Sequence, residues 1–312
     1  MSDAKVQIQL LGQLSIVRDA APLSLPASRK VRALLAYLAL NERGVTRSML
    51  CDLLWETPND PRGELRWCLS KIRRVFDESD KIRIETSGDR IALNVSDCFI
   101  DAIEIDKLLG PGITQLNAEQ LRIACILFRG DFLEGLYIDG NACFNSWLLA
   151  QRHRFKANHV AIVERLGGLL PVGSDEYFQC LRTWLQLAPC DRRAHEALLL
   201  ALAESGRVPD AETHLASAIR QFEVEGVDWL PLREAWRAIR AKCAPSASMS
   251  NKQSVPIEAN SISIDATKEL TTSPRRASVA VMPFVDSSAS GAHRGGMADG
   301  LVEDIITRLA KL

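Results

Sequence analysis

The residues best suited to do chemistry in this sequence form one basic stretch, GELRWCLSKIRRVF at 63–76, with Arg62 directly before it. Together they contain five basic residues, one tryptophan and a single acid, Glu64. If the stretch is a helix, its apolar residues share one face: Leu65, Leu69, Ile72 and Phe76, with Cys68 and Val75 beside them. Most of the basic side chains then lie away from this face. Guanidinium groups bind phosphate and can bond a guanine edge twice, so the pattern predicts contact with nucleic acid.

The outer face of this helix and the segments around it supply two sets of candidate DNA contacts. Base edges need guanidinium and hydroxyl groups, and the candidates are Arg62, Arg66, Trp67, Ser70 and Arg73. The phosphate backbone needs several separated cations, and the candidates are Arg29, Lys30, Arg47, Lys71, Arg74, Arg83 and Arg90. Arg62 and Arg66 are four residues apart. Like charges at this spacing destabilise an isolated helix by roughly 0.2–0.5 kcal/mol, which a bound anion would offset.

The basic face also has an ordinary explanation, because many helices carry solvated basic residues. Trp67 favours a partner, since a large aromatic side chain opposite the apolar stripe usually meets another surface. That partner is either DNA or the region that follows in the chain, and the sequence leaves both open.

The segments on either side indicate which elements hold this helix. Residues 6–26 alternate in polarity like the strands of a small antiparallel sheet. A helix from Ser28, whose side chain could cap it, and a second helix capped by Thr46 come next. The basic helix then begins near Pro61 and a hairpin pattern covers 82–95. Strands, three helices and a closing hairpin in this order predict a winged helix-turn-helix.

The next region is helical almost throughout, with helices expected at 117–128, 144–169, 174–187, 191–205, 208–223 and 231–242. A repeat unit of about 34 residues beginning at Arg192 fits the tetratricopeptide pattern. It places small residues at Ala211 and Ala218, where two helices would pack closely.

These patterns predict a mainly α-helical fold with a small β component and four regions. Residues 1–100 form the winged helix-turn-helix domain, and residues 101–243 form an all-α domain resembling tetratricopeptide repeats. Residues 244–276 are rich in serine, threonine and alanine, as expected of a flexible linker. Residues 277–312 begin with the strand-like SVAVMPF and predict the start of an incomplete α/β domain.

Composition and charge argue against several classes of protein. The net charge of the 312 residues is −1, so affinity for nucleic acid must come from a local patch. Eight cysteines show no C-x-x-C pair and no zinc-finger spacing, which predicts reduced thiols in a cytoplasmic protein and no metal site. The N-terminus does not resemble a signal peptide, and the longest apolar run, ALLAYLAL at 33–40, is too short to span a membrane.

Two linked stretches resemble known bacterial regulators. LPASRKVRALLAYLALNERGVTRSMLCDLLW, followed by LRWCLSKIRRVF, resembles the winged-helix domain of the Streptomyces antibiotic regulatory protein (SARP) type, which is related to response regulators of the OmpR/PhoB type. GDFLEGL, WLLAQRHRF and LAPCDRRAHEALLLALAESGRVPDA resemble the bacterial transcriptional activator domain that follows it. Both resemblances together cover about residues 5–242. SVAVMPF with ADGLVEDIITRL is similar to the start of a TolB-like domain.

The resemblance implies an activator of transcription that binds double-stranded DNA, usually as a homodimer on direct repeats. Helix 61–76 would enter the major groove, and the hairpin at 82–95 would be the wing. The helical domain would contribute to assembly, and RNA polymerase is a candidate partner. Trp67 stands where relatives more often have a polar residue, so base preference does not carry over. No G-x-x-x-x-G-K-[ST] phosphate loop is found, and no cofactor is expected.

Two other classes of protein would also fit parts of the sequence. A protein–protein scaffold built on the helical repeats would make the basic faces incidental, and the salt dependence of DNA binding discriminates against it. An enzyme would need a reactive cluster. Asp299, Glu303 and Asp304 lie near a helix start, where carboxylates commonly complement the helix dipole. The histidines on predicted helices have no nucleophile beside them in a known motif, so no catalysis is expected.

Overall fold

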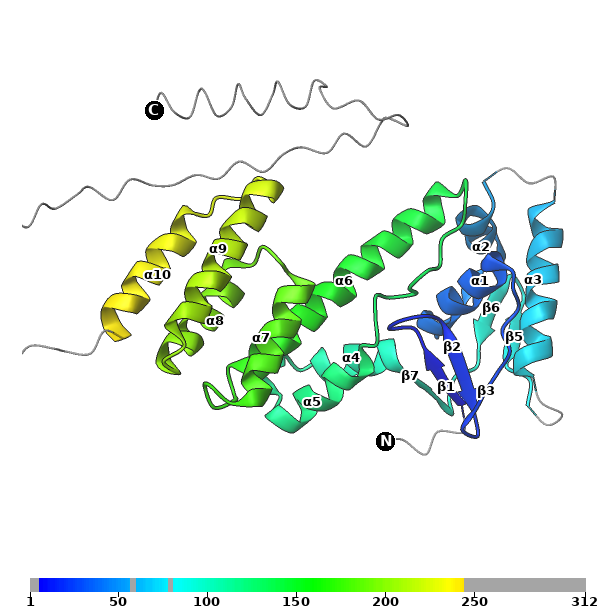
Figure 1. The fold of residues 1–312 in the computed structure, drawn as a ribbon. Coiled ribbons are helices and arrows are strands. Elements are labelled where there is room, and N and C mark those ends of the chain that lie inside the picture. Colours follow the sequence, from blue (N-terminus) through cyan, green and yellow to red (C-terminus); the bar gives the residue numbers. More distant parts are fainter. Residues whose placement is uncertain (1–5, 57–59, 78–80, 244–312) are drawn as a thin grey trace, which may run out of the picture. The chain divides into compact units, whose positions relative to one another are not determined.

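The computed structural model describes residues 6–56, 60–77 and 81–243, and all of them belong to one compact unit (Figure 1). The predicted linker at 244–276 and the predicted start of an α/β domain at 277–312 lie outside the described residues. Helices dominate, and the named strands all lie before residue 101, so the predicted mainly α-helical fold with a small β component is confirmed. In the described part of the chain, no helix is long and apolar enough to cross a membrane.

A four-stranded sheet opens the fold, formed by β1 (Val6–Gln9), β2 (Ser15–Arg18), β3 (Ala21–Pro22) and β7 (Cys98–Ile100). The first three strands pair antiparallel, as the alternation in this segment predicts. The last strand, β7, runs parallel to β1, with Ile100 opposite Ile8. The sequence pattern does not predict β7, because three residues are too few for an alternation to show. This strand brings the end of the winged helix-turn-helix back to the start of the chain.

Three helices and a hairpin follow in the predicted order: α1 (Arg29–Leu40), α2 (Arg47–Leu54), α3 (Pro61–Phe76), and β5 (Ile84–Ser87) with β6 (Arg90–Leu93). A short strand, β4 (Val45–Thr46), pairs with β6 and ties the hairpin to the turn between α1 and α2. The Thr46 side chain caps α2 by accepting a hydrogen bond from the N–H of Met49, as predicted. Ser28 makes no such bond at the start of α1. The winged helix-turn-helix is therefore confirmed.

The rest of the described chain is helical: α4 (Asp101–Leu109), α5 (Ala118–Leu127), α6 (Ala142–Gly167), α7 (Asp175–Leu187), α8 (Arg192–Glu204), α9 (Val208–Glu225) and α10 (Leu230–Cys243), with a 3-10 turn at Ile113–Gln115. The six predicted helices match α5 to α10 within two residues at each end. α8 and α9 form the predicted helix pair, and Ala211 and Ala218 are buried in it. Small side chains at these positions let the two helices pack closely.

Backbone hydrogen bonds join the winged helix-turn-helix to the helical region. The segment 129–134 bonds along residues 10–12, just after β1: Arg129 N–H to Leu11 O, Leu133 N–H to Leu10 O and Gly12 N–H to Asp131 O. The Arg152 guanidinium of α6 also holds this part of the chain, because it donates to the carbonyls of Phe132, Leu133 and Leu136. The motif GDFLEGL at 130–136 is thus part of the joint between the two regions.

The burial of His159 on α6 predicts a stability that depends on pH. Its ring stacks on Phe128 with centroids 4.1 Å apart, and burial lowers the pKa of His159 to about 4. In the unfolded chain the same histidine titrates near pH 6.5, so between pH 6.5 and 4 the unfolded state holds more protons. We therefore expect the free energy of unfolding to fall as the pH is lowered through this range, by up to about 1.4 kcal/mol per pH unit for this residue.

Urea unfolding at several pH values between 7 and 4 measures this dependence. His159→Phe keeps an aromatic ring against Phe128 and should reduce the slope, because the variant has no proton to gain at this position. A variant whose stability falls with pH as steeply as that of the wild type would contradict the assignment.

Candidate nucleic-acid interface

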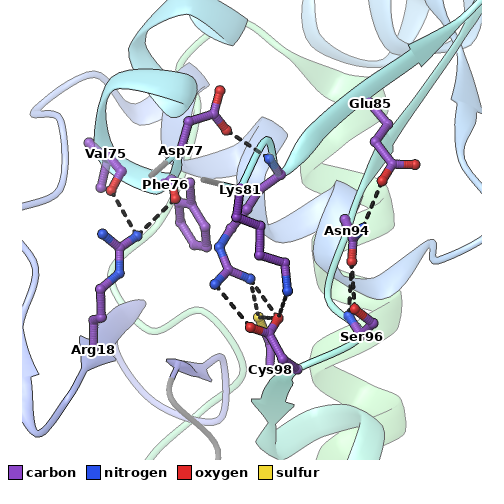
Figure 2. Close-up of polar contacts among 11 residues, drawn as sticks. Arg18, Val75, Phe76, Asp77, Lys81, Glu85, Asn94, Ser96 and Cys98 are labelled. Carbon is purple, nitrogen blue, oxygen red and sulfur yellow. Dashed lines mark hydrogen bonds and ion pairs between the residues drawn. The ribbon is translucent and has the colours of Figure 1, made fainter. Parts of the chain in front are cut away.

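α3 is buried on one face, and hydrogen bonds hold both of its ends. Its buried side chains are those predicted from spacing: Leu65, Cys68, Leu69, Ile72 and Phe76. At its start, the Asp60 side chain accepts a hydrogen bond from the N–H of Gly63 at 2.8 Å. At its end, Arg18 of β2 donates to the carbonyls of Val75 and Phe76 (Figure 2). These contacts fix the helix axis against the sheet and leave the outer face to solvent.

The outer face of α3 carries the predicted base-reading side chains together. Arg62, Arg66, Trp67 and Ser70 are exposed, and Arg73 is half-buried. The Trp67 side chain contacts Lys71, whose Nζ lies 5.2 Å from the centre of an indole ring, yet 48% of the residue remains exposed. α3 lies on the far side of α1 and α2 from α6 (Figure 1). Nearly half of Trp67 is therefore open to a partner outside the described chain.

Two of the base-reading candidates already have partners close by in sequence. The Arg66 guanidinium lies 3.7 Å from the Asp60 carboxylate, with both side chains more than half exposed. Exposed ion pairs of this kind contribute little, so a phosphate or a base can replace Asp60. Ser70 donates its hydroxyl hydrogen to the carbonyl of Trp67 at 2.7 Å. Its oxygen can still accept, which suits a donor such as the amino group of adenine or cytosine.

Predicted phosphate contacts surround this face on α3, α2 and the hairpin. Arg74 is exposed, whereas Lys71 and Arg47 are half-buried. Arg90, at the start of β6, is exposed and donates to the carbonyl of Gly44 at 3.2 Å. These cations lie on three different elements, which suits contact with several phosphates.

The two candidates on α1 already have partners. Lys30 lies over the ring of Trp55, with Nζ 5.5 Å from its centre. Arg29 forms an ion pair at 3.1 Å with Asp139, which lies just before α6. Both groups of this pair are more than half exposed, so solvent screens the attraction. A phosphate at Arg29 would replace Asp139, which links this cation to the helical region.

The structure contradicts the predicted role of Arg83 as a phosphate contact. Its side chain has no exposed surface and donates to both carboxylate oxygens of Asp97, at 2.7 and 3.2 Å. The Lys81 Nζ lies 2.8 Å from the same carboxylate. The Arg83 guanidinium beside Asp97 holds the pKa of that carboxyl well below its usual range. The prediction was wrong because a positive charge in the sequence does not reveal the partner that buries it.

Two residues that position the interface were missed in the sequence. Arg18 holds the end of α3 from a strand 57 residues earlier in the chain, so no local pattern points to it. Asp77, the residue after α3, accepts a hydrogen bond from the backbone N–H of Arg83 at 2.9 Å. A carboxylate is unfavourable beside the negative end of a helix dipole. An acid at that position is therefore a signal that another partner is present.

Groups for other chemistry do not gather in the described chain. No cluster there of three or more histidine, cysteine, aspartate or glutamate side chains could hold a metal ion. The cysteines are free thiols, and burial raises the pKa of Cys68, Cys98 and Cys125 to about 11. Because the thiolate is the reactive form, these three side chains are unreactive near neutral pH.

The helical region matches a known family. Residues 104–239 fit the family model of the bacterial transcriptional activator domain. We call this region the activator domain, after the family whose model it matches. The activator domain begins within α4 and ends within α10, and it contains the motif at 130–136 that joins it to the winged helix-turn-helix. With the winged helix-turn-helix in front of the activator domain, the chain has the domain order of the SARP type that its sequence resembles.

Among solved structures, the chain is similar to Mycobacterium tuberculosis EmbR in complex with a low affinity phosphopeptide. Sequence identity is 20% and the TM-score is 0.54. The match covers 76% of this chain and 65% of the EmbR chain, so this chain spans less than two thirds of that relative's length. At this identity, the likeness shows a shared fold. No curated protein matches this chain.

Proposed function

We propose that this chain is a DNA-binding activator of transcription of the SARP type, in which α3 enters the major groove and the β5–β6 hairpin contacts the flanking groove or backbone. The observation that carries the proposal is the outer face of α3. Arg62, Arg66 and Arg74 are exposed and Lys71 and Arg73 are half-buried, while the opposite face is buried and hydrogen bonds hold both ends of the helix. The activator domain that follows supports a role in transcription.

The side chains of this face divide into two roles. Arg62, Arg66, Trp67, Ser70 and Arg73 read base edges, since they lie on the exposed side of a helix of the size that the major groove admits. Arg47, Lys71, Arg74 and Arg90 hold phosphates around it, and Arg29 and Lys30 extend the set onto α1. Arg83 has no part in either role, because it is buried.

The same proposal includes assembly on DNA. A homodimer on direct repeats, with contacts between activator domains, follows from the resemblance to the SARP type, and RNA polymerase is a candidate partner. Analytical ultracentrifugation of the full chain with duplexes that carry one or two half-sites measures the stoichiometry. Binding of a single copy to a two-site duplex would overturn the dimer.

The α8–α9 helix pair favours a second candidate, a protein-binding scaffold without specific DNA binding. Its tetratricopeptide-like packing is the form in which many helical repeats present surfaces to other proteins. In that case the affinity for duplex DNA would be the same for all sequences, and variants on α3 would not change it.

Duplex selection followed by affinity measurement at several salt concentrations tests the proposal. The logarithm of the binding constant should fall linearly with the logarithm of salt, by about 0.9 for each phosphate contacted. Arg66→Ala and Arg73→Ala should each weaken binding to the selected duplex by about 1–3 kcal/mol and relax the preference at one base position.

Arg237→Ala provides the matched control, because this arginine is exposed on α10, far along the chain from α3. Its binding should equal that of the wild type. Folding of each variant is checked by circular dichroism. If both α3 variants fold and bind the selected duplex as tightly as the wild type, the proposed reading face is wrong.

A further inference from the structure

An ion pair between the buried Arg83 and the partly exposed Asp97 closes the open end of the β5–β6 hairpin. Arg83 directly precedes β5 and Asp97 follows β6, and two hydrogen bonds join their side chains, at 2.7 and 3.2 Å. The backbone N–H of Asn94 also donates to the carbonyl of Arg83 at 2.7 Å. A guanidinium and a carboxylate joined by two bonds have a defined mutual orientation, unlike a pair joined by one. The ion pair thus sets the angle at which the hairpin leaves the domain.

The same place is tied to the end of α3. Asp77, the residue after α3, accepts a hydrogen bond from the N–H of Arg83, while Arg18 holds the last carbonyls of the helix (Figure 2). Arg83 also lies 3.4 Å from Cys98 Sγ at the start of β7. One set of polar contacts therefore connects the end of α3, the base of the hairpin and the sheet.

A contribution to the stability of the fold does not by itself explain this ion pair. The Asp97 side chain is 35% exposed, so water screens part of the attraction, while taking the Arg83 guanidinium out of water costs free energy. The far end of the hairpin is attached separately, through the pairing of β4 with β6 and the bond from Arg47 N–H to Asp89 O. The orientation at the base of the hairpin depends on Arg83 and Asp97, and the position of Arg90, which pairs with Thr46, depends on both attachments.

We infer that the Arg83–Asp97 ion pair positions the wing against α3, so that Arg90 of the wing and the outer face of α3 meet the same DNA duplex. The inference rests on the DNA-binding function proposed above. Arg83 and Asp97 are positioning residues, since Arg83 has no exposed surface and the Asp97 carboxylate would repel a phosphate. Arg90 is the exposed cation that they act through.

The test compares the full chain with a double variant, Arg83→Met with Asp97→Leu, which removes both charges of the pair together. The Lys81 side chain, which also contacts Asp97, is 30% exposed and can turn to water. Arg122→Met with Glu176→Leu is the matched control, because this pair between α5 and α7 also has two bonds, at 2.6 and 3.0 Å. Arg83→Lys is a second test variant. It keeps the charge next to Asp97 but replaces the two-pronged guanidinium by a single ammonium.

The first measurement is amide hydrogen exchange of the free proteins. Amides of β5 and β6 should lose protection in the double variant and in Arg83→Lys, while those of α3 and of the activator domain keep it. The control pair should leave the hairpin unchanged. If the hairpin keeps its protection in Arg83→Lys, or in the folded double variant, the inference is wrong, whether or not the chain binds DNA.

The second measurement is duplex binding against salt for the wild type, Arg90→Ala, the double variant and the triple variant. Arg90→Ala should reduce the slope by about 0.9, the contribution of one phosphate contact. The double variant should reduce the slope by the same amount. The triple variant, which combines Arg90→Ala with the double variant, should reduce it no further. Discrimination between the selected duplex and a mutated one should remain, because α3 is intact. Additive losses in the triple variant would overturn the inference, whereas a wild type without salt-dependent binding would overturn the proposed function itself.

Discussion

Replacing Asp101 with alanine should lower the free energy of unfolding by about 3–5 kcal/mol, because several buried N–H groups would lose their acceptor together. Asp101 is 1% exposed and begins α4. Its carboxylate accepts hydrogen bonds from the backbone N–H groups of Leu10, Leu11 and Ala102, at 2.8 to 3.1 Å. Arg129 adds a salt bridge at 2.8 Å. One side chain thus joins the end of β1, the start of α4 and the segment that begins the joint between the two regions.

Asp101→Asn should lower the free energy of unfolding less than Asp101→Ala does, since the amide keeps one oxygen as an acceptor. Its NH2 group, however, would face a donor at the position where Oδ2 now accepts. Burial raises the pKa of Asp101, while the N–H donors and Arg129 favour its charged form. The side chain of Arg129 is 41% exposed, so its guanidinium can turn to water when the carboxylate is removed. Most of the cost therefore comes from the backbone N–H groups.

Urea unfolding followed by circular dichroism measures these differences. Asp106→Ala is the matched control on the same helix, because Asp106 forms a partly exposed ion pair with Arg154 at 2.7 Å. Its loss should cost less than about 1 kcal/mol. Equal effects of Asp101→Ala and Asp106→Ala would show that Asp101 does not hold the joint.

The buried face of α3 was predictable because it depends only on spacing within one helix. Apolar residues three and four positions apart must share a face, and the structure buries the ones expected. The cap at Thr46 is local in the same sense, since its bond spans three residues. The hairpin was predictable from two alternating runs around a turn with Gly88, whose φ of +58° suits glycine.

Contacts between distant parts of the chain were not predictable in this way. Asp101 bonds to a residue 91 positions earlier, and β7 pairs with β1 across a similar separation. Arg29 and Asp139 are 110 positions apart. No spacing rule connects such residues, because their proximity is set by how the helices and strands pack. For the same reason, the sequence could list the arginines near α3 but could not distinguish the buried Arg83 from the exposed Arg90.

Phe222→Ala should destabilise α8 to α10 by about 3–5 kcal/mol while leaving duplex binding unchanged. Phe222 of α9 is 1% exposed and meets the ring of His195 edge-on at 5.2 Å. It belongs to a hydrophobic cluster separate from the main core, formed by Leu199, Leu202, Ala203, Ala211, Leu215, Ala218, Phe222, Leu232 and Trp236. Helical repeats contact mainly their neighbours, so a cavity in this cluster weakens α8 to α10 first.

Hydrogen exchange with mass spectrometry locates the effect, and duplex affinity at fixed salt reports on α3. Protection should fall in α8, α9 and α10 and persist in α1 to α3, because the winged helix-turn-helix has its side chains in the main core. Val224→Ala, on the same helix but 85% exposed, should change stability by less than about 0.5 kcal/mol. Loss of protection throughout the chain, or weaker DNA binding by Phe222→Ala, would show instead that the activator domain and the winged helix-turn-helix unfold as one unit. In that case the stability of α8 to α10 would itself control how much of the chain can bind DNA.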